Sequence, residues 1–458
     1  MSGEFPSMTA ADLHNDAHFL RAVSQMAESQ RVIARQAIYA QGGVKLLEQG
    51  GQIDGRLYER LMQHRLVQGL DEQLVAQNPV DVHALQAQVR HYVHSTALGR
   101  LLAEFMGHKQ QRWQEALAQM AWPDAVCFQL TVLRQQLPQL FEHSLGVMMV
   151  AVALAVEEGL SRDDCAELAA AALLHDIGML YMPRHWTDPR YKLTPQEYKQ
   201  LAAHSVIAML LVRSTQAYTS RVEDAVLQHH ERLDGSGYPS AIKGGDITQW
   251  GRILMLAEVV AAFYDKYSDI PAQRLSLMLR MNHQRFDARL MQHVFRILQL
   301  ETQAQASSAS HSQTEVRQVI ATLGAVFQHW SKCKHALPRD WQVQEGGRIG
   351  VFVDARLQAL EKSLAESGSH PRQQADWLAI FQEDPSSMAE VVMINKEALW
   401  QVAYCVETCI RRWPQVMQPT TEVEQRLHDW LVSCRGVLEE ASVAAGERMP
   451  LERGTPAA

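Results

Sequence analysis

Apolar residues recur with helical spacing along most of the chain, most clearly between residues 124 and 300. Positions three and four apart lie on one face of a helix, so these runs predict helices with one buried side. Start signals accompany them: Ser161 precedes an acidic first turn, and Thr194 is followed by proline and then by an acid at the third position. We therefore expect a mainly α protein.

Four helices are expected in this region. One runs from Ser161 to near Gly178, and a second follows Thr194 and carries KQLAAHSVIAMLLV. A third carries RVEDAVLQHHE and stops at a glycine-rich loop, because glycine-rich segments end helices. Thr248 caps the fourth, QWGRILMLAEVVAAFYDKY.

The N-terminal part has a different pattern. Residues 35–53 hold two short apolar runs separated by Gly-Gly pairs, which predicts a small β-hairpin. Helical patterns follow, and Trp122-Pro123-Asp124 marks a break. We expect a mostly helical regulatory or interaction domain over 1–122.

Composition shifts divide the rest of the chain. The segment 302–314 is rich in Ala, Ser and Gln and is typical of a linker. Residues 315–446 return to helical patterns, and 447–458 form a tail. We predict a catalytic-type domain over 123–301, this linker, and a C-terminal helical domain.

Bulk composition narrows the class of protein. The 458 residues are 47% hydrophobic with a formal charge of −8, which supports packed cores and argues against a partner that is a nucleic-acid polymer. The longest apolar run, 145–156, is too short to span a bilayer, and no signal-peptide pattern opens the chain. Six scattered cysteines without a CxxC pair favour a reduced, cytoplasmic protein.

Histidines and acids gather in the apolar helical patterns of the middle region. A single histidine there is usually a satisfied core residue, but a buried Glu258 needs a partner or a cation. Together the set favours convergence on metal: His143, His175, Asp176, His204, His229, His230 and Glu258. Imidazole with carboxylate fits iron, manganese or zinc, and the absence of thiolates argues against a structural zinc site.

The adjacent pairs suggest two ions. Neighbours on a helix point about 100° apart, so we expect His229 and His230 to serve one ion each. Asp176 has two oxygens and can bridge the ions while His175 binds one of them. Such a two-metal centre suits phosphoester hydrolysis.

His143, the HDIG of 175–178, His204 and the HHERLDGSGYP of 229–239 resemble the HD-GYP family of HD phosphohydrolases. The resemblance covers about a third of the chain, near residues 130–300. It implies an all-helical domain that hydrolyses the bacterial second messenger cyclic di-GMP to pGpG or GMP at two or three iron or manganese ions. By resemblance the six histidine and aspartate residues above occupy the family's ligand positions, and Glu258 stands where an Asp is usual.

The chain departs from this family pattern at three places. Met179 replaces a lysine that helps at the reacting phosphate. Gln139 replaces a glutamate that supports a third metal in some members, so we expect two ions. After Glu258 the chain reads AAFYDKYSD in place of DAL…RPY, with Lys266 as its one cation.

The glycine-rich loop is the candidate substrate wall. Gly235 and Gly237 permit backbone angles that turn amides toward an anion, and Tyr238 offers a stacking face and a hydroxyl. The competing interpretation is a plain turn between helices with solvated charges. The predicted substrate-contacting residues are Arg232, Asp234, Gly235, Gly237, Tyr238, Pro239 and Lys243.

Two classes of function remain. The ligand set favours a metal-dependent phosphodiesterase for cyclic di-GMP, slowed by Met179. The departures favour a catalytically impaired module that binds metal, a cyclic dinucleotide or a protein as a signalling receptor or scaffold. Another HD-type nucleotide hydrolase is disfavoured by the GYP loop. A homodimer or a signalling-protein partner is compatible with the flanking domains.

Overall fold

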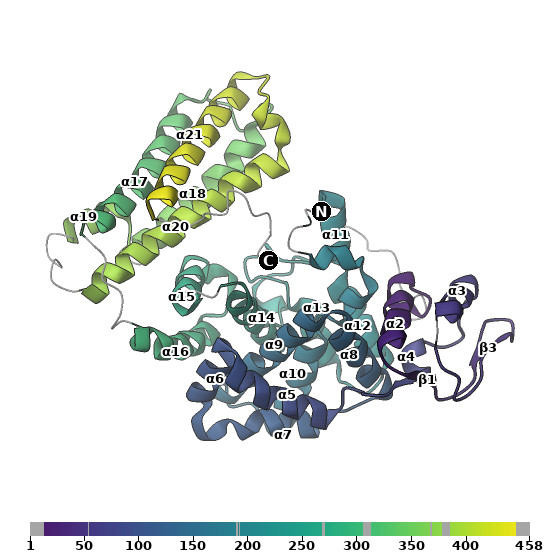
Figure 1. Ribbon diagram of the computed structural model, residues 1–458. Coiled ribbons are helices and arrows are strands. Elements are labelled where there is room, and N and C mark those ends of the chain that lie inside the picture. The colour runs from purple at the N-terminus through teal and green to yellow at the C-terminus, as the bar shows by residue number, and fades with distance from the viewer. Residues whose placement is uncertain are drawn as a thin grey trace. The chain divides into compact units, whose positions relative to one another are not determined.

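The described residues are mainly helical, which confirms the expected mainly α class (Figure 1). The computed structural model describes residues 13–53, 55–188, 191, 193–267, 271–305, 313–366, 369–377 and 385–445. The chain forms two compact units, which are described separately. The first holds the described residues up to 271 together with 284–300, and the second holds 272–283 and those from 301 onward.

The N-terminal part of the first unit contains two small antiparallel sheets. Strand β2 (Ile38–Tyr39) pairs with β3 (Lys45–Leu47), and Gly42 and Gly43, both with positive φ, lie in the turn between them. The predicted hairpin is therefore confirmed. The second sheet, β1 (Val32–Ala34) with β4 (Leu74–Ala76), joins segments distant in sequence. A pairing of this kind leaves no local signal.

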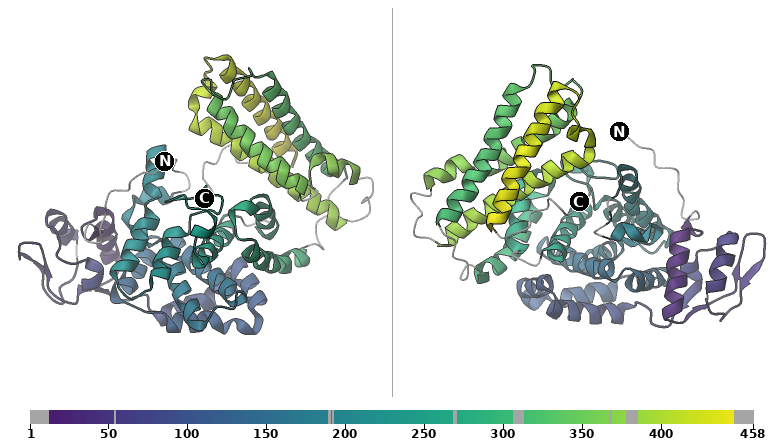
Figure 2. Two further views of the ribbon diagram at one scale, coloured as in Figure 1. Left: turned by 180° about the vertical axis from the view of Figure 1, so that it is seen from behind. Right: turned by 45° about the horizontal axis from the view of Figure 1, so that its top comes forward.

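Helix α9 (Pro138–Glu157) is the centre of the first unit. Its residues 144–155 are all buried, and α10 (Arg162–Leu174) and α14 (Gln249–Lys266) pack along it (Figures 1 and 2). By length and composition alone α9 could cross a membrane, because an 18-residue stretch of it has a mean hydropathy of 1.6. However, 72% of that stretch is buried inside the protein. Packing between helices therefore accounts for its apolar composition.

Three of the predicted helix starts are present. Ser161 accepts from Asp164 N–H, Thr248 accepts from Gly251 N–H, and Thr194 with Glu197 forms a capping box at α11 (Pro195–Leu201). The helix expected after Thr194 is broken, however. It divides at residues 202–203, and α12 (His204–Ser214) begins with the histidine itself.

The second unit has a core of four long helices (Figure 2). They are α17 (Gln313–Ala336), α18 (Gly347–Glu366), α20 (Pro385–Arg412) and α21 (Glu422–Ala445). Trp330 and Trp430 meet inside it with ring centroids 5.0 Å apart. Of the predicted linker, residues 302–305 belong to α16 and 313–314 to α17, and 306–312 lie outside the described residues. The predicted tail also lies outside them.

The predicted domain limits stay predictions. Residues on either side of 122 belong to one compact unit, and the second unit takes over at residue 301. The C-terminal segment is helical, as the pattern indicated.

The remaining elements have the following bounds. The α-helices of residues 13–267 are α2 (Ala17–Ser29), α3 (Gly55–Gln63), α4 (Leu70–Gln73), α5 (Val82–Ser95), α6 (Ala97–Met106), α7 (Gln111–Gln119), α8 (Asp124–Gln136) and α13 (Ser220–Gln228). Those that follow are α15 (Pro271–Met281), α16 (Ala288–Gln305) and α19 (Pro371–Trp377). The 3-10 helices are η1 (Gly107–Lys109), η2 (Ile177–Tyr181), η3 (Arg184–Thr187), η4 (Gly244–Asp246), η5 (His283–Arg285) and η6 (Pro414–Met417).

Gly178 lets η2 lie directly against the start of α12. A Cβ at this position would stand 2.1 Å from the carbonyl oxygen of His204, a backbone atom that moves only with its helix. We expect Gly178→Ala to lower the free energy of unfolding by about 1–3 kcal/mol, as overpacking does. Urea denaturation followed by circular dichroism measures this.

The matched control is Gly245→Ala, where an added Cβ meets nothing within 4 Å and φ is ordinary. This control should change the unfolding free energy by less than about 0.5 kcal/mol. Equal stability of the two variants would contradict the close approach of η2 and α12.

Candidate metal centre

Three histidines lie where helices end or begin, and the same kind of hydrogen bond orients each of them. The Nδ1 atoms of His175, His204 and His229 lie 2.7, 2.7 and 2.6 Å from backbone carbonyl oxygens three residues earlier. A carbonyl only accepts, so each Nδ1 carries the proton. In the neutral ring each Nε2 therefore presents a lone pair to the interior, the form in which imidazole binds metals.

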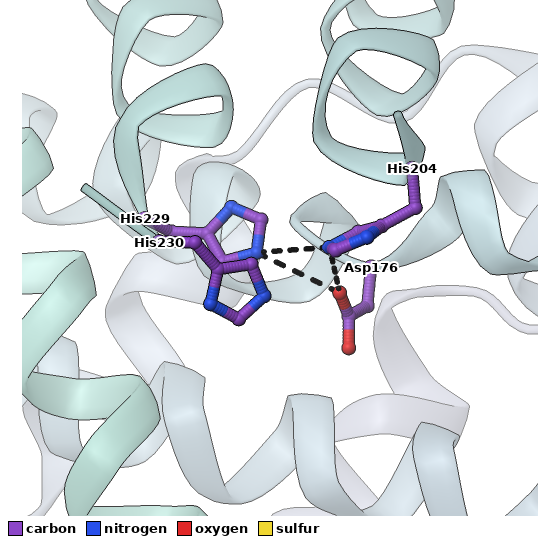
Figure 3. Close-up of side chains that lie close together, drawn as sticks. All are labelled: Asp176, His204, His229 and His230. Carbon is purple, nitrogen blue, oxygen red and sulfur yellow. Dashed lines mark hydrogen bonds and ion pairs between the residues drawn. The ribbon is translucent and has the colours of Figure 1, made fainter. Parts of the chain in front are cut away.

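The first set of donors is the histidine group, defined as Asp176, His204, His229 and His230. Its ligand atoms all lie within 4.8 Å of one another. Figure 3 shows the side chains converging: Asp176 Oδ1 is 3.1 Å from His204 Nε2 and 3.7 Å from His229 Nε2. His204 and His229 come within 3.3 Å through their Nε2 atoms.

The second set is the Glu258 group, defined as His143, His175 and Glu258, again with ligand atoms within 4.8 Å. Glu258 Oε2 lies 2.7 Å from His143 Nε2 and 3.2 Å from His175 Nε2. Asp176 links the two sets, because its second oxygen, Oδ2, is 3.4 Å from His175 Nε2. One carboxylate thus faces both groups, and its role as a bridging ligand stays a prediction.

The donor set suits divalent cations. Two Nε2 lone pairs at 3.3 Å repel each other unless a cation or a proton lies between them. The Nε2 atom of His175 is fully buried and forms no hydrogen bond, although two carboxylate oxygens lie close to it. The Nδ1 atom of His230 is likewise buried without a partner. A nitrogen and oxygen set of this kind is typical of iron, manganese or zinc.

Four of these residues have pKa values that favour the protonation state in which they can bind a metal ion. Burial alone would raise the pKa of Asp176 and Glu258, but the neighbouring imidazoles hold both carboxyls well below their ordinary pKa. Burial lowers the pKa of His229 and His230, the latter strongly. Ionised carboxylates and neutral imidazoles are the forms that bind metal.

Two further donor residues, His143 and His175, have raised pKa values because carboxylates lie beside them. Burial lowers the pKa of His143, yet Glu258 and Asp265 together raise it well above its ordinary value. Burial also lowers the pKa of His175, but Asp176 and Glu258 raise it to about 10. Without a cation these imidazoles hold protons where Nε2 would bind metal, so metal binding releases protons.

The expected separation of His229 and His230 does not occur. Both join the histidine group, and their ring centroids are 4.0 Å apart with a tilt of 46°. The expectation assumed a continuous helix, but α13 ends at Gln228, so the pair lies in a turn. Helical geometry therefore does not set the angle between the two side chains.

The glycine-rich loop folds back onto this turn. A Cβ on Gly237 would stand 2.4 Å from the carbonyl oxygen of His230, and Tyr238 N–H donates to the same oxygen at 3.1 Å. The Tyr238 ring lies 4.6 Å from the ring of His230, so it forms a wall of the histidine group. Pro239 follows it directly. Gly235 has a φ of +76°, and the Lys243 side chain occupies the space beside its Cα.

Charged residues of the loop mostly hold the loop itself. Arg232 is only 5% exposed and donates to the carbonyls of His229 and Glu231. Asp234 accepts from Ser236 and pairs with Arg285. Contact of these residues with a ligand stays a prediction.

Sequence reasoning missed two supporting carboxylates. Asp265 accepts from His143 Nδ1 at 2.7 Å, so it orients that ring as the backbone carbonyls orient the others. Its signal is spacing: Asp265 lies seven residues, two helical turns, after Glu258 on the same face of α14. Glu231 is 1% exposed and accepts from Ser240 N–H, which anchors the exit of the loop.

Comparison with known proteins finds a known family over the part of the chain that holds both donor groups. A family model described as HD domain matches residues 128–290. A stretch of 120 residues is 31% identical to the cyclic di-GMP phosphodiesterase PdeB of Borreliella burgdorferi, covering 26% of this chain and 31% of that protein. A stretch of 122 residues is 35% identical to the 3'3'-cGAMP-specific phosphodiesterase 1 of Vibrio cholerae, covering 27% and 28%.

The matches thus span less than a third of the length of either curated relative. A solved structure, Bd1817, a HDG"Y"P protein from Bdellovibrio bacteriovorus, is 16% identical over 59% of this chain and 94% of that one, with a TM-score of 0.32, too low to support an inference. The family-model match spans the HDIG and HHERLDGSGYP motifs and all seven residues of the two donor groups. Residues 128–290 therefore match the HD domain family, and the similarity to cyclic dinucleotide phosphodiesterases supports the resemblance to the HD-GYP family.

Proposed function

We propose that this protein is a metal-dependent phosphodiesterase that opens a cyclic dinucleotide, with cyclic di-GMP as the first candidate substrate and the cytoplasm as its location. The observation that carries the proposal is the pair of donor groups that share Asp176. Relatives named as phosphodiesterases for cyclic di-GMP and for 3'3'-cGAMP support the substrate class. Cyclic di-GMP and 3'3'-cGAMP each contain two phosphodiester bonds between nucleotides.

The side chains have distinct tasks in this proposal. The Glu258 group and the histidine group would hold one ion each, with Asp176 shared between them. Bound divalent ions supply hydroxide near neutral pH and neutralise charge on phosphate oxygens. The backbone carbonyls that accept from the Nδ1 atoms keep the imidazoles in place, so no reorganisation is needed during reaction.

Hydrolysis adds one water across a phosphodiester bond. The phosphorus gains a hydroxyl oxygen, the bond to the ribose oxygen breaks, and that oxygen leaves with a proton. The ring opens to the linear dinucleotide, and a second cut yields mononucleotides. Tyr238, packed on His230, covers one side of the histidine group and limits access of bulk water there.

The ions are proposed to be iron or manganese, with zinc as the alternative. All seven donor side chains offer nitrogen or oxygen, and none offers a thiolate. Imidazole with carboxylate is the set these metals share. Two donor groups support two ions.

A receptor without turnover is the second candidate function. It is favoured by Met179, an apolar side chain one 3-10 turn after Asp176, where a cation would assist a phosphate. In this case the donor groups hold metal and the domain binds a cyclic dinucleotide without cutting it. A homodimer or a signalling-protein partner would then read the bound state.

One experiment separates these functions. The full chain is purified anaerobically, bound metal is quantified by mass spectrometry, and turnover of cyclic di-GMP and 3'3'-cGAMP is followed by chromatography. We expect about two ions per chain and turnover of at least one substrate. Asp176→Ala should lose metal and turnover, because it removes the ligand shared by both groups.

The matched control is Asp163→Ala, which removes an exposed carboxylate at the start of α10 and leaves its C-terminal end intact. It should keep wild-type metal content and rate. Metal without turnover would leave only the receptor, and a wild-type chain that binds no metal would overturn both functions.

Position 179 tests the catalytic proposal directly. Met179→Lys adds a cation beside the site, and a charge-assisted contact with a phosphate oxygen should raise the phosphodiesterase rate by about tenfold. Initial rates on cyclic di-GMP at matched metal content measure it. Met179→Gln, similar in length and uncharged, should leave the rate near wild type, and an unchanged rate for the lysine variant would refute this account of the position.

Asp265 tests how His143 is held. Removing a carboxylate that orients a ligand imidazole weakens metal binding about 10- to 100-fold, so we expect this loss for Asp265→Ala. Asp265→Asn keeps an oxygen that accepts from Nδ1–H and should retain most of the affinity. Competition with a chromogenic chelator gives both values. Wild-type affinity in the alanine variant would mean that Asp265 does not position His143 for metal.

A further inference from the structure

A cavity of about 250 Å³ opens beside Met179 within the first unit. Helix α2 contributes His18 and Arg21 to its wall, the junction of α8 and α9 contributes Leu137, and Arg184 closes another side. The cavity is therefore built jointly by the N-terminal part and by the segment that follows the His-Asp doublet.

The backbone of η2 places this cavity next to the metal centre. Met179 N–H donates to Asp176 O at 2.9 Å, and Met182 N–H donates to Met179 O at 3.2 Å, the three-residue repeat of a 3-10 helix. Side chains three residues apart eclipse one another in this helix, so Asp176, Met179 and Met182 share a face. The cavity wall thus begins one turn from the bridging carboxylate.

The cavity is cationic. Arg21, Arg184 and His18 line it, and none of the described lining residues carries a carboxylate. Three hydrogen bonds hold Arg184 in place, to Gln25 and twice to Gln136, and a guanidinium has five donors. Arg21 is exposed, and the described part of the chain gives its guanidinium no hydrogen bond or ion pair. Unpaired guanidinium donors of this kind suit phosphate.

The remaining wall is apolar and pliable. Met179, Met182 and Leu137 present thioether and methyl groups, which adapt to a flat ring. A pocket for a drug-sized molecule has about 300–1,000 Å³, so this cavity is too small for a whole cyclic dinucleotide. Its size, its cations and its apolar wall fit one nucleotide unit.

We propose that this cavity binds one nucleotide unit of the substrate, with Arg21 and Arg184 at its phosphate and the base against Met179 and its neighbours. The inference rests on the proposed function, because it names the subsite beside that reaction centre. Arg21 belongs to α2, so the N-terminal part completes the substrate site and its removal would weaken ligand binding.

The test uses the metal-loaded full chain with GMP as the probe for binding and cyclic di-GMP as the substrate. Removing a charged hydrogen-bonding group typically weakens binding about tenfold or more, so Arg21→Ala and Arg21→Gln should raise the Kd for GMP and the KM for cyclic di-GMP by that factor. Metal content and melting temperature should stay at wild-type values. Isothermal titration and initial rates provide the measurements.

Two further variants make the test specific. Arg31→Ala removes an exposed arginine just beyond the end of α2 and outside the cavity, and should leave Kd and KM unchanged. Arg21→Lys keeps a cation at the same place in the wall and should retain more of the affinity than Arg21→Ala or Arg21→Gln. A purely structural role of Arg21 would not make affinity follow the charge in this way.

The outcomes separate this inference from the proposed function. Turnover with unchanged Kd and KM in both Arg21 variants overturns the cavity as a subsite and leaves the phosphodiesterase intact. Absence of turnover in wild type, with GMP binding that depends on Arg21, supports the subsite and overturns catalysis. An equal loss of affinity in Arg21→Lys and Arg21→Gln also overturns the subsite, because a contact with phosphate depends on the charge.

Discussion

The Nδ1–H groups of His175, His204 and His229 donate to backbone carbonyls three residues earlier, and the site depends on these three hydrogen bonds. In an uninterrupted helix each of those carbonyls accepts from a backbone N–H four residues later. A histidine that takes over the carbonyl stands where the helix ends or restarts, and its ring is fixed by the same bond. The same hydrogen bond therefore accompanies the end of the helix and orients the ligand imidazole. It occurs at the end of α10, at the junction of α11 and α12, and at the end of α13.

The apolar surroundings make this arrangement sensitive to charge. Helix α9 and its neighbours exclude water from the donor atoms, so an isolated Asp176 or Glu258 carboxylate would be costly there. Each carboxylate instead faces two or more imidazoles, which lower the pKa of the carboxyl. The carboxylates in turn raise the pKa of the His175 imidazole. The same low dielectric strengthens the attraction of both carboxylates to any cation held between them. A core this apolar thus favours a metal centre over an array of unpaired groups.

Features with local causes were predictable from the sequence, and features that need a distant partner were not. The capping box at Thr194, the glycine turn of the hairpin and the apolar run of α9 depend on residues close in sequence, and each agrees with the structure. The convergence of histidines was also predictable, because buried imidazoles beside a buried carboxylate are costly without a cation. Periodicity continues through residues 202–203, however, and gives no sign that His204 starts a new helix. The role of Asp265 requires knowing that His143 on α9 lies opposite α14, which is a tertiary contact.

The N-terminal part bears on the site through packing as well as through the cavity. Phe19 of α2 stacks on Tyr181 of η2 with ring centroids 4.8 Å apart and planes within 6°. Arg184, just beyond η2, bonds to Gln25 of the same helix. Both contacts fix the segment that begins at Asp176. The position of the carboxylate shared by both donor groups therefore depends on the packing of α2 against η2.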